Sequence, residues 1–451
     1  MSYLIHVFTF DGVNIVLDVH SNAVHIIDEA TRQIIIDYEA LSETDLLNKY
    51  SVVFGSQEVE EILAEIKELI DTGLLFSPDP LPKGYEPSDK QEVKALCLNL
   101  SHDCNLRCKY CFAGQGDFGG HRELMSEQVG KKALDFLLVS SGARRHVEVD
   151  FFGGEPLMNK DVLKKLVFYG QKKAAEAGKE IKFTLTTNAL LLDEEMNRFI
   201  REHNLAVVLS ADGRPQVHDL MRITPAGSGS YTQVLSRIKS FTSLANTWEY
   251  VIRGTFTHYN CDFSEDVQFL AEQGFSRISV EPVVATPEHD YAFQEQDVAV
   301  LLAEYDKLTR YLLAKRKQGQ AVDFFHFNID IDGGPCLSKR LTGCSAGLEY
   351  LAVAPDGSLY PCHQFVGQDD FKVGNVLAGF SGAQVTAQFR AAHIYTKSTC
   401  RECWAKFHCS GGCHANAYNF NGDLLKPYHL GCLLTRKRLE CALYLKHANN
   451  G

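Results

Sequence analysis

Three cysteines lie within eight residues in the segment CNLRCKYC, at Cys104, Cys108 and Cys111. The segment follows the apolar run ALCLNL, which is typical of a β-strand, so we expect the three thiols in a loop at the carboxyl end of that strand. Thiolates at these spacings can bind three irons of a cube-shaped iron-sulfur cluster and leave the fourth iron open to an outside molecule. A structural zinc site takes four protein ligands, which is one more than this segment supplies. The spacing therefore favours iron-sulfur chemistry.

Most of the other cysteines are also grouped. Of the 14 cysteines in the chain, eight form a second group between residues 336 and 432, at Cys336, Cys344, Cys362, Cys400, Cys403, Cys409, Cys413 and Cys432. Because cytosolic thiols are kept reduced, such groups indicate metal ligands rather than disulfides. The spacing alone leaves zinc open as an alternative metal for the C-terminal group. Cys97, Cys261 and Cys441 lie in apolar settings, and we expect them to be small buried side chains.

The chain that positions these thiols begins with a predicted N-terminal domain. With 451 residues the chain is long enough for two or three domains. Residues 1–80 combine short β-branched runs with later helical patterns, which we interpret as a winged-helix-like domain, and the proline-rich segment 81–92 as a linker. The expected strands are 3–9, 13–18 and 23–27, and the expected helices are 42–49 and 57–72.

Residues 93–320 alternate between strand and helix patterns. The predicted strands are 94–100, 146–152, 182–187, 205–210, 249–257 and 276–281, and the predicted helices are 126–140, 160–177, 193–203, 231–244, 265–273 and 293–317. Six strand-then-helix units predict a parallel sheet, curved into a partial (β/α)6 TIM-like barrel with ligands at the carboxyl ends of its strands. Residues 321–451 are rich in glycine and cysteine with short elements, so we expect metal to be needed for their core. The predicted fold class is α/β.

The net charge of −12 lies entirely in the N-terminal domain. Residues 1–80 hold three basic residues against fifteen acidic ones, and the rest of the chain is neutral. An acidic surface repels phosphate backbones, so we expect no nucleic-acid partner and favour a partner that carries basic residues. The N-terminus lacks a signal peptide, and no apolar run approaches the roughly 18 residues of a membrane span. We therefore predict a cytoplasmic protein with no membrane partner.

The spacing C-x3-C-x2-C, with the aromatic Tyr110 before the last cysteine, resembles the hallmark of the radical S-adenosylmethionine (SAM) enzymes. The resemblance implies a [4Fe-4S] cluster on Cys104, Cys108 and Cys111, with the amine and carboxylate of SAM on the fourth iron. In that family an external reductant of the flavodoxin or ferredoxin type supplies an electron that cleaves SAM. The products are methionine and a 5′-deoxyadenosyl radical, which removes hydrogen from the substrate.

Two glycines and a carboxylate follow the second predicted strand, in FFGGEP at residues 151–156. Because glycine has no side chain, Gly153 and Gly154 let the backbone approach the SAM amine closely. Glu155 supplies an anionic partner for an ammonium group. The resemblance therefore implies that these three residues bind SAM.

Two later stretches fit the same family. LSADGRPQVHDLMR, at residues 209–222, resembles the sulfatase-maturating and peptide-modifying branch, in which Ser210 and Arg222 match residues for the SAM carboxylate and ribose. Asp212 and Asp219 in this stretch can equally be turn caps. VEPVV, at residues 280–284, resembles the strand end that contacts adenine, which implies Val283 as the contact.

The order of the C-terminal cysteines resembles the SPASM extension of radical SAM enzymes, which carries two auxiliary [4Fe-4S] clusters. The resemblance implies auxiliary cluster I on Cys344, Cys362 and Cys413, and auxiliary cluster II on Cys400, Cys403, Cys409 and Cys432. Cys336 either completes cluster I or leaves an open iron for a substrate thiolate. The implied cofactors are therefore SAM and three [4Fe-4S] clusters.

All three domains together resemble the radical SAM/SPASM maturases of the "six cysteines in forty-five" (SCIFF) peptides. The resemblance implies that the leader of a small Cys-rich precursor peptide adds as a strand at 23–27 and packs on the helix at 57–72. It also implies thioether crosslinks from a substrate Cys sulfur to a carbon of an acceptor residue, expected to be Thr. Two alternatives stay open. One is a sulfatase-maturating enzyme that forms formylglycine and would need no leader-binding domain, and the other is a non-catalytic, zinc-binding peptide adaptor.

Overall fold

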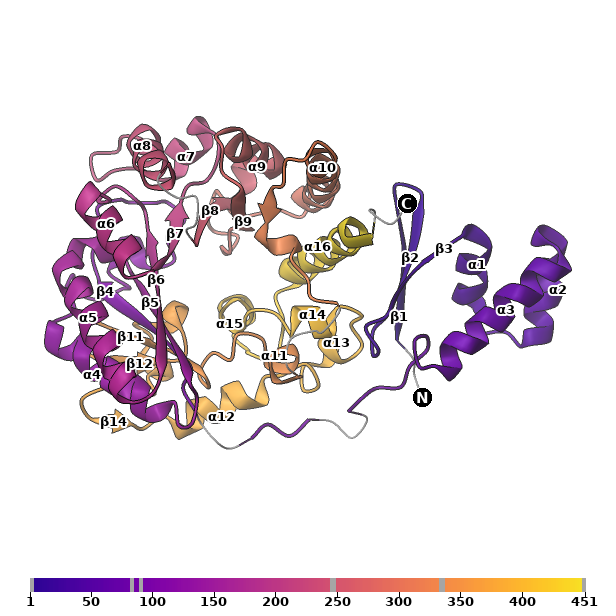
Figure 1. The fold of residues 1–451 in the computed structure, drawn as a ribbon, viewed down its shortest axis with the longest axis horizontal. Coiled ribbons are helices and arrows are strands. Elements are labelled where there is room, and N and C mark those ends of the chain that lie inside the picture. Colours follow the sequence, from indigo (N-terminus) through magenta and orange to yellow (C-terminus); the bar gives the residue numbers. More distant parts are fainter. Residues whose placement is uncertain (1–3, 82–84, 89–91, 244–248, 332–336, 448–451) are drawn as a thin grey trace.

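The N-terminal unit stands at one end of the molecule, at the right of Figure 1. The computed structural model describes residues 4–81, 85–88, 92–243, 249–331 and 337–447. The unit contains an antiparallel sheet of β1 (Ile5–Phe10), β2 (Val13–Asp18) and β3 (Val24–Ile27), followed by α1 (Glu29–Asp37), α2 (Glu43–Phe54) and α3 (Ser56–Asp71). These strands and α3 match the predicted ranges, α2 continues to Phe54 beyond the predicted end at residue 49, and α1 was not predicted. The winged-helix-like description stays a prediction, and six residues of the predicted linker 81–92 lie outside the described residues.

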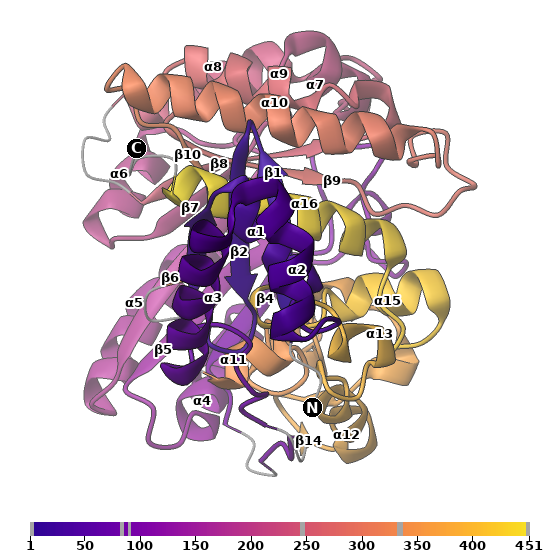
Figure 2. The same cartoon turned by 90° about the vertical axis from the view of Figure 1, so that its right-hand side faces the viewer.

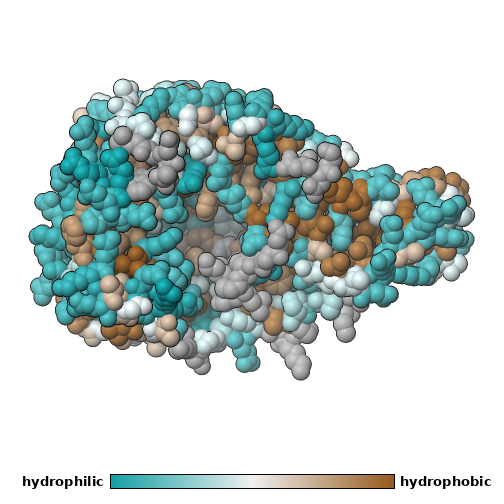
Figure 3. All heavy atoms as spheres, in the orientation of Figure 1, coloured by the Kyte–Doolittle hydropathy of each residue, from teal (hydrophilic) through white to brown (hydrophobic). Residues whose placement is uncertain are grey.

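Aromatic contacts dock the N-terminal unit on the C-terminal part of the chain. The rings of His6 and Trp404 stack with centroids 3.7 Å apart, and the rings of Phe10 and Tyr444 stack at 4.3 Å. Figure 2 faces the unit and shows its strands in front of the C-terminal helices. Apolar side chains gather on the outer end of this unit and where it meets the body of the protein (Figure 3). The position of β3 and α3 relative to the body is therefore fixed by packing.

A parallel sheet forms the centre of the molecule. Its strands are β4 (Ala95–Ser101), β5 (His146–Gly153), β6 (Glu180–Thr187), β7 (Ala206–Ser210), β8 (Tyr250–Phe256) and β9 (Arg277–Pro282). The helices that alternate with them are α4 (Glu127–Ser140), α5 (Lys160–Glu176), α6 (Glu194–Glu202), α7 (Pro215–Met221), α8 (Tyr231–Thr242), α9 (Phe263–Glu272) and α10 (Asp297–Lys317). This order confirms the predicted α/β class. The sheet does not close into a barrel, because β4 and β9 pair with further strands on their outer sides.

The C-terminal part consists mostly of short elements, as expected. They are β10 (Asp323–Phe324), β11 (Tyr350–Val353), β12 (Ser358–Tyr360), β13 (Gly374–Asn375), β14 (Gly379–Phe380), α11 (Leu337–Thr342), α12 (Ala383–Ala391), α13 (Ser398–Arg401), α14 (Lys406–Cys409) and α15 (His414–Asn421). The expectation is wrong for α16 (His429–His447), which has 19 residues and packs along α10. Leu434, Leu439 and Leu443 on α16 are buried, so this helix joins the apolar core of the protein. No described helix combines the length and apolar composition that a membrane span needs.

Candidate active site

The three thiols of CNLRCKYC lie in a loop directly after β4, as predicted, and line one cavity of about 240 Å³. The segment after α7 holds this loop in place. The backbone N–H groups of Arg107 and Lys109 donate to the carbonyl groups of Ile223 and Met221, at 2.7 and 2.9 Å. Hydrogen bonds between the two backbones therefore fix the cysteine loop, independently of its side chains.

Five of the six predicted SAM-binding residues line the same cavity: Gly153, Gly154, Ser210, Arg222 and Val283. They come from the ends of β5, β7 and β9 and from the segment after α7. Parallel strands that lie side by side end at one edge of their sheet, so residues far apart in the sequence meet there. The structure thus brings the predicted cofactor residues together with the predicted cluster ligands.

The two glycines at the end of β5 allow it to pass directly beneath the cysteine loop. Gly153 has φ +127°, and a Cβ atom added there would lie 2.4 Å from the carbonyl oxygen of Ser101. A Cβ atom on Gly154 would lie 2.2 Å from the carbonyl oxygen of Asp103. Since no side chain fits at these distances, any other residue would push the cysteine loop away from the sheet.

Glu155 lies behind the cavity wall rather than on it. Its buried carboxylate accepts hydrogen bonds from the backbone N–H groups of Leu157 and Asn188, at 3.0 and 2.8 Å, and from Thr187 Oγ1 at 2.8 Å. Burial raises the pKa of Glu155 to about 6, although these donors favour its ionised form. In this structure Glu155 ties β5 to β6, and its contact with an ammonium group stays a prediction.

Arg222 is joined to the aromatic residue of the cysteine loop. It is only 8% exposed, and its Nη1 donates to Tyr110 Oη at 2.8 Å, while Tyr110 Oη donates to Asp212 Oδ2 at 2.7 Å. Asp212 therefore supports Tyr110 without itself lining the cavity, whereas Asp219 accepts from the backbone of Tyr231 and fits the alternative of a turn cap. Arg222 Nε is buried and has no hydrogen-bond partner among the described residues. An unsatisfied donor beside a cavity suits a bound acceptor such as a carboxylate or hydroxyl group.

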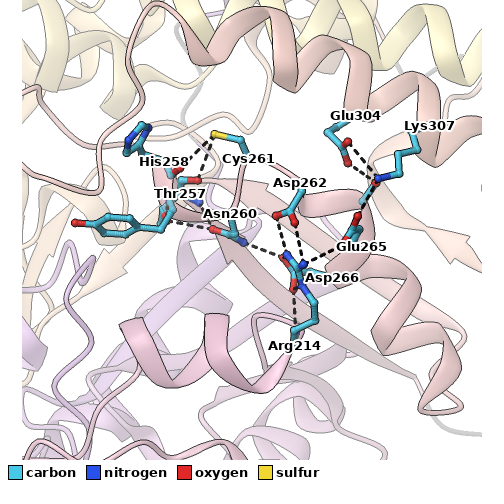
Figure 4. A network of polar contacts seen from close by, with 12 residues as sticks. Arg214, Thr257, His258, Asn260, Cys261, Asp262, Glu265, Asp266, Glu304 and Lys307 are labelled. Carbon is cyan, nitrogen blue, oxygen red and sulfur yellow. Dashed lines mark hydrogen bonds and ion pairs between the residues drawn. The ribbon is translucent and has the colours of Figure 1, made fainter.

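An ion-pair network fixes the loop between β7 and α7 (Figure 4). Arg214 pairs with Asp262, Glu265 and Asp266, at the start of α9, with nitrogen–oxygen distances of 2.7, 2.9 and 2.8 Å. Asp266 is wholly buried, so this pairing is well shielded from water. The network holds the strand end from which Ser210 lines the cavity.

Sequence reasoning missed several polar residues of the cavity, among them Asn188, Arg253, Glu281 and His363. Asn188 Nδ2 lies 3.7 Å from Cys104 Sγ, and Arg253 Nη2 donates to Glu281 Oε2 at 2.6 Å. The first three stand at or near strand ends, where parallel sheets bind ligands, so that rule could have found them. His363 comes from the C-terminal part, and no local pattern pointed to it. Burial lowers the pKa of His363 to about 4.

One C-terminal cysteine group consists of Cys344, Cys362 and Cys413. Burial raises the pKa of the Cys362 thiol, and the neighbouring thiols of Cys413 and Cys344 raise it further. The members of this group are those predicted for auxiliary cluster I. The possible fourth ligand, Cys336, lies outside the described residues.

The second group consists of Cys400, Cys403, Cys409 and Cys432, the members predicted for auxiliary cluster II. Burial raises the pKa of Cys400 to about 12, and the other three thiols act in the same direction. All cysteines in the described parts of the chain are free. Thiols from both groups line a second cavity, of about 440 Å³. Grouped free thiols beside a cavity are a donor set that fits an iron-sulfur cluster.

Sequence comparison identifies two families in this chain. The family described as "Radical SAM superfamily" matches residues 98–243, and the family described as "Iron-sulfur cluster-binding domain" (SPASM) matches residues 344–404. The chain is 23% identical to the radical SAM cyclopropyl synthase TigE of Paramaledivibacter caminithermalis, over 88% of this chain and 86% of that protein. It is 25% identical to the cysteine-type anaerobic sulfatase-maturating enzyme of Clostridium novyi, over 72% of this chain and 89% of that protein.

Solved structures share this fold. The match to anSMEcpe with bound AdoMet has a TM-score of 0.64 at 21% identity and covers 79% of this chain and 99% of that one. The match to Streptococcus suis SuiB bound to S-adenosylmethionine has a TM-score of 0.55 at 16% identity and covers 96% of this chain and 100% of that one. With its cysteine loop, its strand-end cavity and its C-terminal thiol groups, this chain carries a radical SAM domain and an iron-sulfur cluster-binding SPASM domain.

Proposed function

We propose that this protein is a radical SAM peptide maturase that installs thioether crosslinks, from Cys to a carbon of Thr, in a ribosomally made Cys-rich precursor peptide. The observation that carries the proposal is a groove in the N-terminal unit of a chain with radical SAM and SPASM domains. A leader peptide bound in that groove would tether its substrate segment to the same protein that holds the cofactor cavity.

The groove runs between β3 and α3 and has a volume of about 270 Å³. It is lined by His25, Ile26, Ile27, Asp28, Thr31, Ile35, Ile62, Glu65, Ile66, Leu69 and Leu75. Because β3 is an edge strand of its sheet, a peptide can add to it as a further strand and bury apolar side chains against α3. Asp28 and Glu65 favour a leader that carries Lys or Arg.

The comparisons support a peptide maturase with this extra unit. SuiB, whose fold extends over nearly the whole of this chain, has been solved bound to the precursor peptide SuiA. The fold of anSMEcpe extends over 79% of this chain, and that protein has been solved with bound peptides. Sulfatase maturation is the second candidate function, since the sulfatase-maturating enzyme of Clostridium novyi aligns over 89% of its length.

Each cofactor has a set of residues that would hold it. The cysteine loop would hold the first [4Fe-4S] cluster, and the two C-terminal groups would hold auxiliary clusters I and II. When bound, SAM and the clusters supply the electron transfer and the 5′-deoxyadenosyl radical that removes a hydrogen atom from the acceptor carbon. Ser210 and Arg222 would bind the carboxylate and ribose of SAM, and Val283 would contact its adenine.

Forming the sulfur–carbon bond removes one hydrogen atom from the carbon, and one proton and one electron from the thiol. Glu281 can take the proton, and auxiliary cluster I, when bound, would accept the electron. Glu281 is the only carboxylate among the described residues that line the cavity. Burial acts to raise the pKa of Glu281, but the charges around it, Arg253 first, hold that pKa below its usual value. The carboxylate is thus ionised and can accept a proton at its Oε atoms.

Anaerobic reconstitution with SAM, a reductant and a leader-bearing Cys-rich peptide tests the proposal. We expect mass spectrometry to show a loss of two hydrogens per bridge, with the bridged cysteines protected from alkylation. A product with an aldehyde in place of a cysteine would instead support sulfatase-type chemistry and contradict the proposal.

The groove can be tested separately by charge reversal. Glu65→Lys should weaken binding of a fluorescent leader peptide about tenfold, because it places a cation where the groove has an anion. Glu60→Lys is the matched control, since Glu60 is exposed on α3 but does not line the groove. Equal loss of affinity in both variants would contradict binding in this groove.

A further inference from the structure

Lys397 is a lysine without any exposed surface, just before α13. Its Nζ donates to the carbonyl oxygen of Gly411 at 2.8 Å, in the short loop that joins Cys409 to Cys413. Among the described residues no carboxylate forms an ion pair with this ammonium group, and the charges that most favour its protonated form belong to cysteines. A buried cation needs a nearby anion, because a single carbonyl group does not replace the water that it has lost.

The cysteines around Lys397 belong to both C-terminal groups. Burial lowers the pKa of Lys397, and the thiols of Cys400, Cys409, Cys413 and Cys344 oppose that shift. Cys400 also donates its backbone N–H to the carbonyl oxygen of Lys397 at 2.9 Å. Lys397 is therefore bonded through Nζ to the loop that joins Cys409 of one group to Cys413 of the other, and through its backbone to Cys400. The thiolates of these groups are the anions available to it.

We propose that Lys397 is a counter-cation shared by the two C-terminal cysteine groups, and that its charge raises the reduction potentials of the clusters that they hold. The inference rests on the proposed function only in taking these groups as iron-sulfur ligands. A cluster with several thiolates becomes more negative when it is reduced. A fixed positive charge nearby stabilises the reduced form. One lysine bonded to segments of both groups has this effect on both clusters.

The test compares Lys397→Met with Lys397→Arg in the full-length, iron-loaded protein. Iron and acid-labile sulfide are measured per chain, and the clusters are then titrated anaerobically under electron paramagnetic resonance. At a fixed ambient potential we expect the reduced fraction of the auxiliary clusters to fall about tenfold in Lys397→Met and to stay close to wild type in Lys397→Arg. The cluster on the loop with Cys104 is the internal reference.

Lys406→Met provides a matched control for the loss of a buried lysine. Lys406 lies in the same part of the chain, but its Nζ lies 3.5 Å from Asp79 Oδ2, and the other polar contacts of that Nζ are with His20 and the carbonyl oxygen of Arg401. We expect this variant to leave the potentials of the auxiliary clusters unchanged. A shift as large as that of Lys397→Met would overturn the inference.

Each remaining outcome also decides the question. Loss of iron in Lys397→Met but not in Lys397→Arg supports the inference, because it shows that the charge stabilises the clusters. Equal potentials and iron contents in Lys397→Met and wild type overturn it, and so do equal changes in the Met and Arg variants. Iron in wild type at the first cluster alone overturns it as well. Wild-type protein with full iron content but no crosslinked product would contradict the proposed function alone.

Discussion

The cysteine loop and the C-terminal cysteine groups bring thiols together in different ways. The loop supplies three thiols from eight consecutive residues, and it rests on β4, whose Leu96, Leu98 and Leu100 are fully buried in the sheet. The C-terminal groups collect thiols from segments that extend from the connection between α11 and β11 to α16. The loop is therefore positioned by an apolar core that exists without metal, whereas the C-terminal groups depend on many short elements. This difference predicts separate roles and separate responses to iron.

The strongest test of the loop is Cys104→Ala. We expect SAM cleavage to fall by about a thousandfold or more, because one of the three iron ligands is lost and the loop has no substitute. Formation of 5′-deoxyadenosine, followed by chromatography, measures the effect. Cys97→Ala serves as the control, since Cys97 is buried in β4 and does not line the cavity. Normal SAM cleavage by Cys104→Ala would show that the cysteine loop does not hold the cluster that cleaves SAM.

Cys432→Ala tests the C-terminal groups against the loop. We expect SAM cleavage to stay within about threefold of wild type while crosslinked peptide falls at least about a hundredfold, because the first cluster is intact and the second group is not. The same reaction mixture gives both products. Cys441→Ala is matched to it, because both cysteines lie on α16 and Cys441 belongs to neither group. Parallel loss of both products in Cys432→Ala would show that the two regions do not act separately.

Removal of iron should distinguish the two regions structurally. In protein treated anaerobically with a chelator, we expect backbone amides of β4 to β9 to keep their protection from hydrogen exchange, while those between Cys400 and Cys432 lose about tenfold or more. The sheet is stabilised by buried apolar side chains, which the chelator does not touch. Hydrogen exchange followed by mass spectrometry measures this. An equal loss of protection in both regions would contradict the inference that the sheet supports the cysteine loop without metal.

A smaller effect concerns the pH dependence of the sheet region. His218 is buried, its Nε2 lies 3.0 Å from Ser230 Oγ, and burial lowers its pKa to about 3. Between about pH 6.5 and 3 the unfolded chain binds a proton that the folded chain does not, so the free energy of unfolding falls as the pH drops through this range. His218→Gln should reduce this slope by up to about 1.4 kcal/mol per pH unit. Urea unfolding at several pH values checks it, and an unchanged slope would exclude His218 as a source.

Much of the site followed from local pattern. The position of CNLRCKYC after an apolar run predicted thiols at a strand end, and the structure has them there. The family resemblance implied Gly153, Ser210 and Val283 as SAM contacts, and all three line one cavity. Sequence reasoning could not assign Glu155 correctly between wall and support, because the direction of a side chain depends on the donors that surround it. Nor could it find His363, which reaches the cavity from another domain.

The sequence by itself determined the order of strands and helices and the spacing of the thiols, because both depend on residues that are neighbours along the chain. The tertiary structure decided which distant residues meet. It placed Arg222 beside Tyr110, the N-terminal unit against Trp404 and Lys397 against the loop that joins the two cysteine groups. These long-range contacts follow from the pairing of strands and the packing of helices that are far apart in the sequence. No local sequence pattern predicts them.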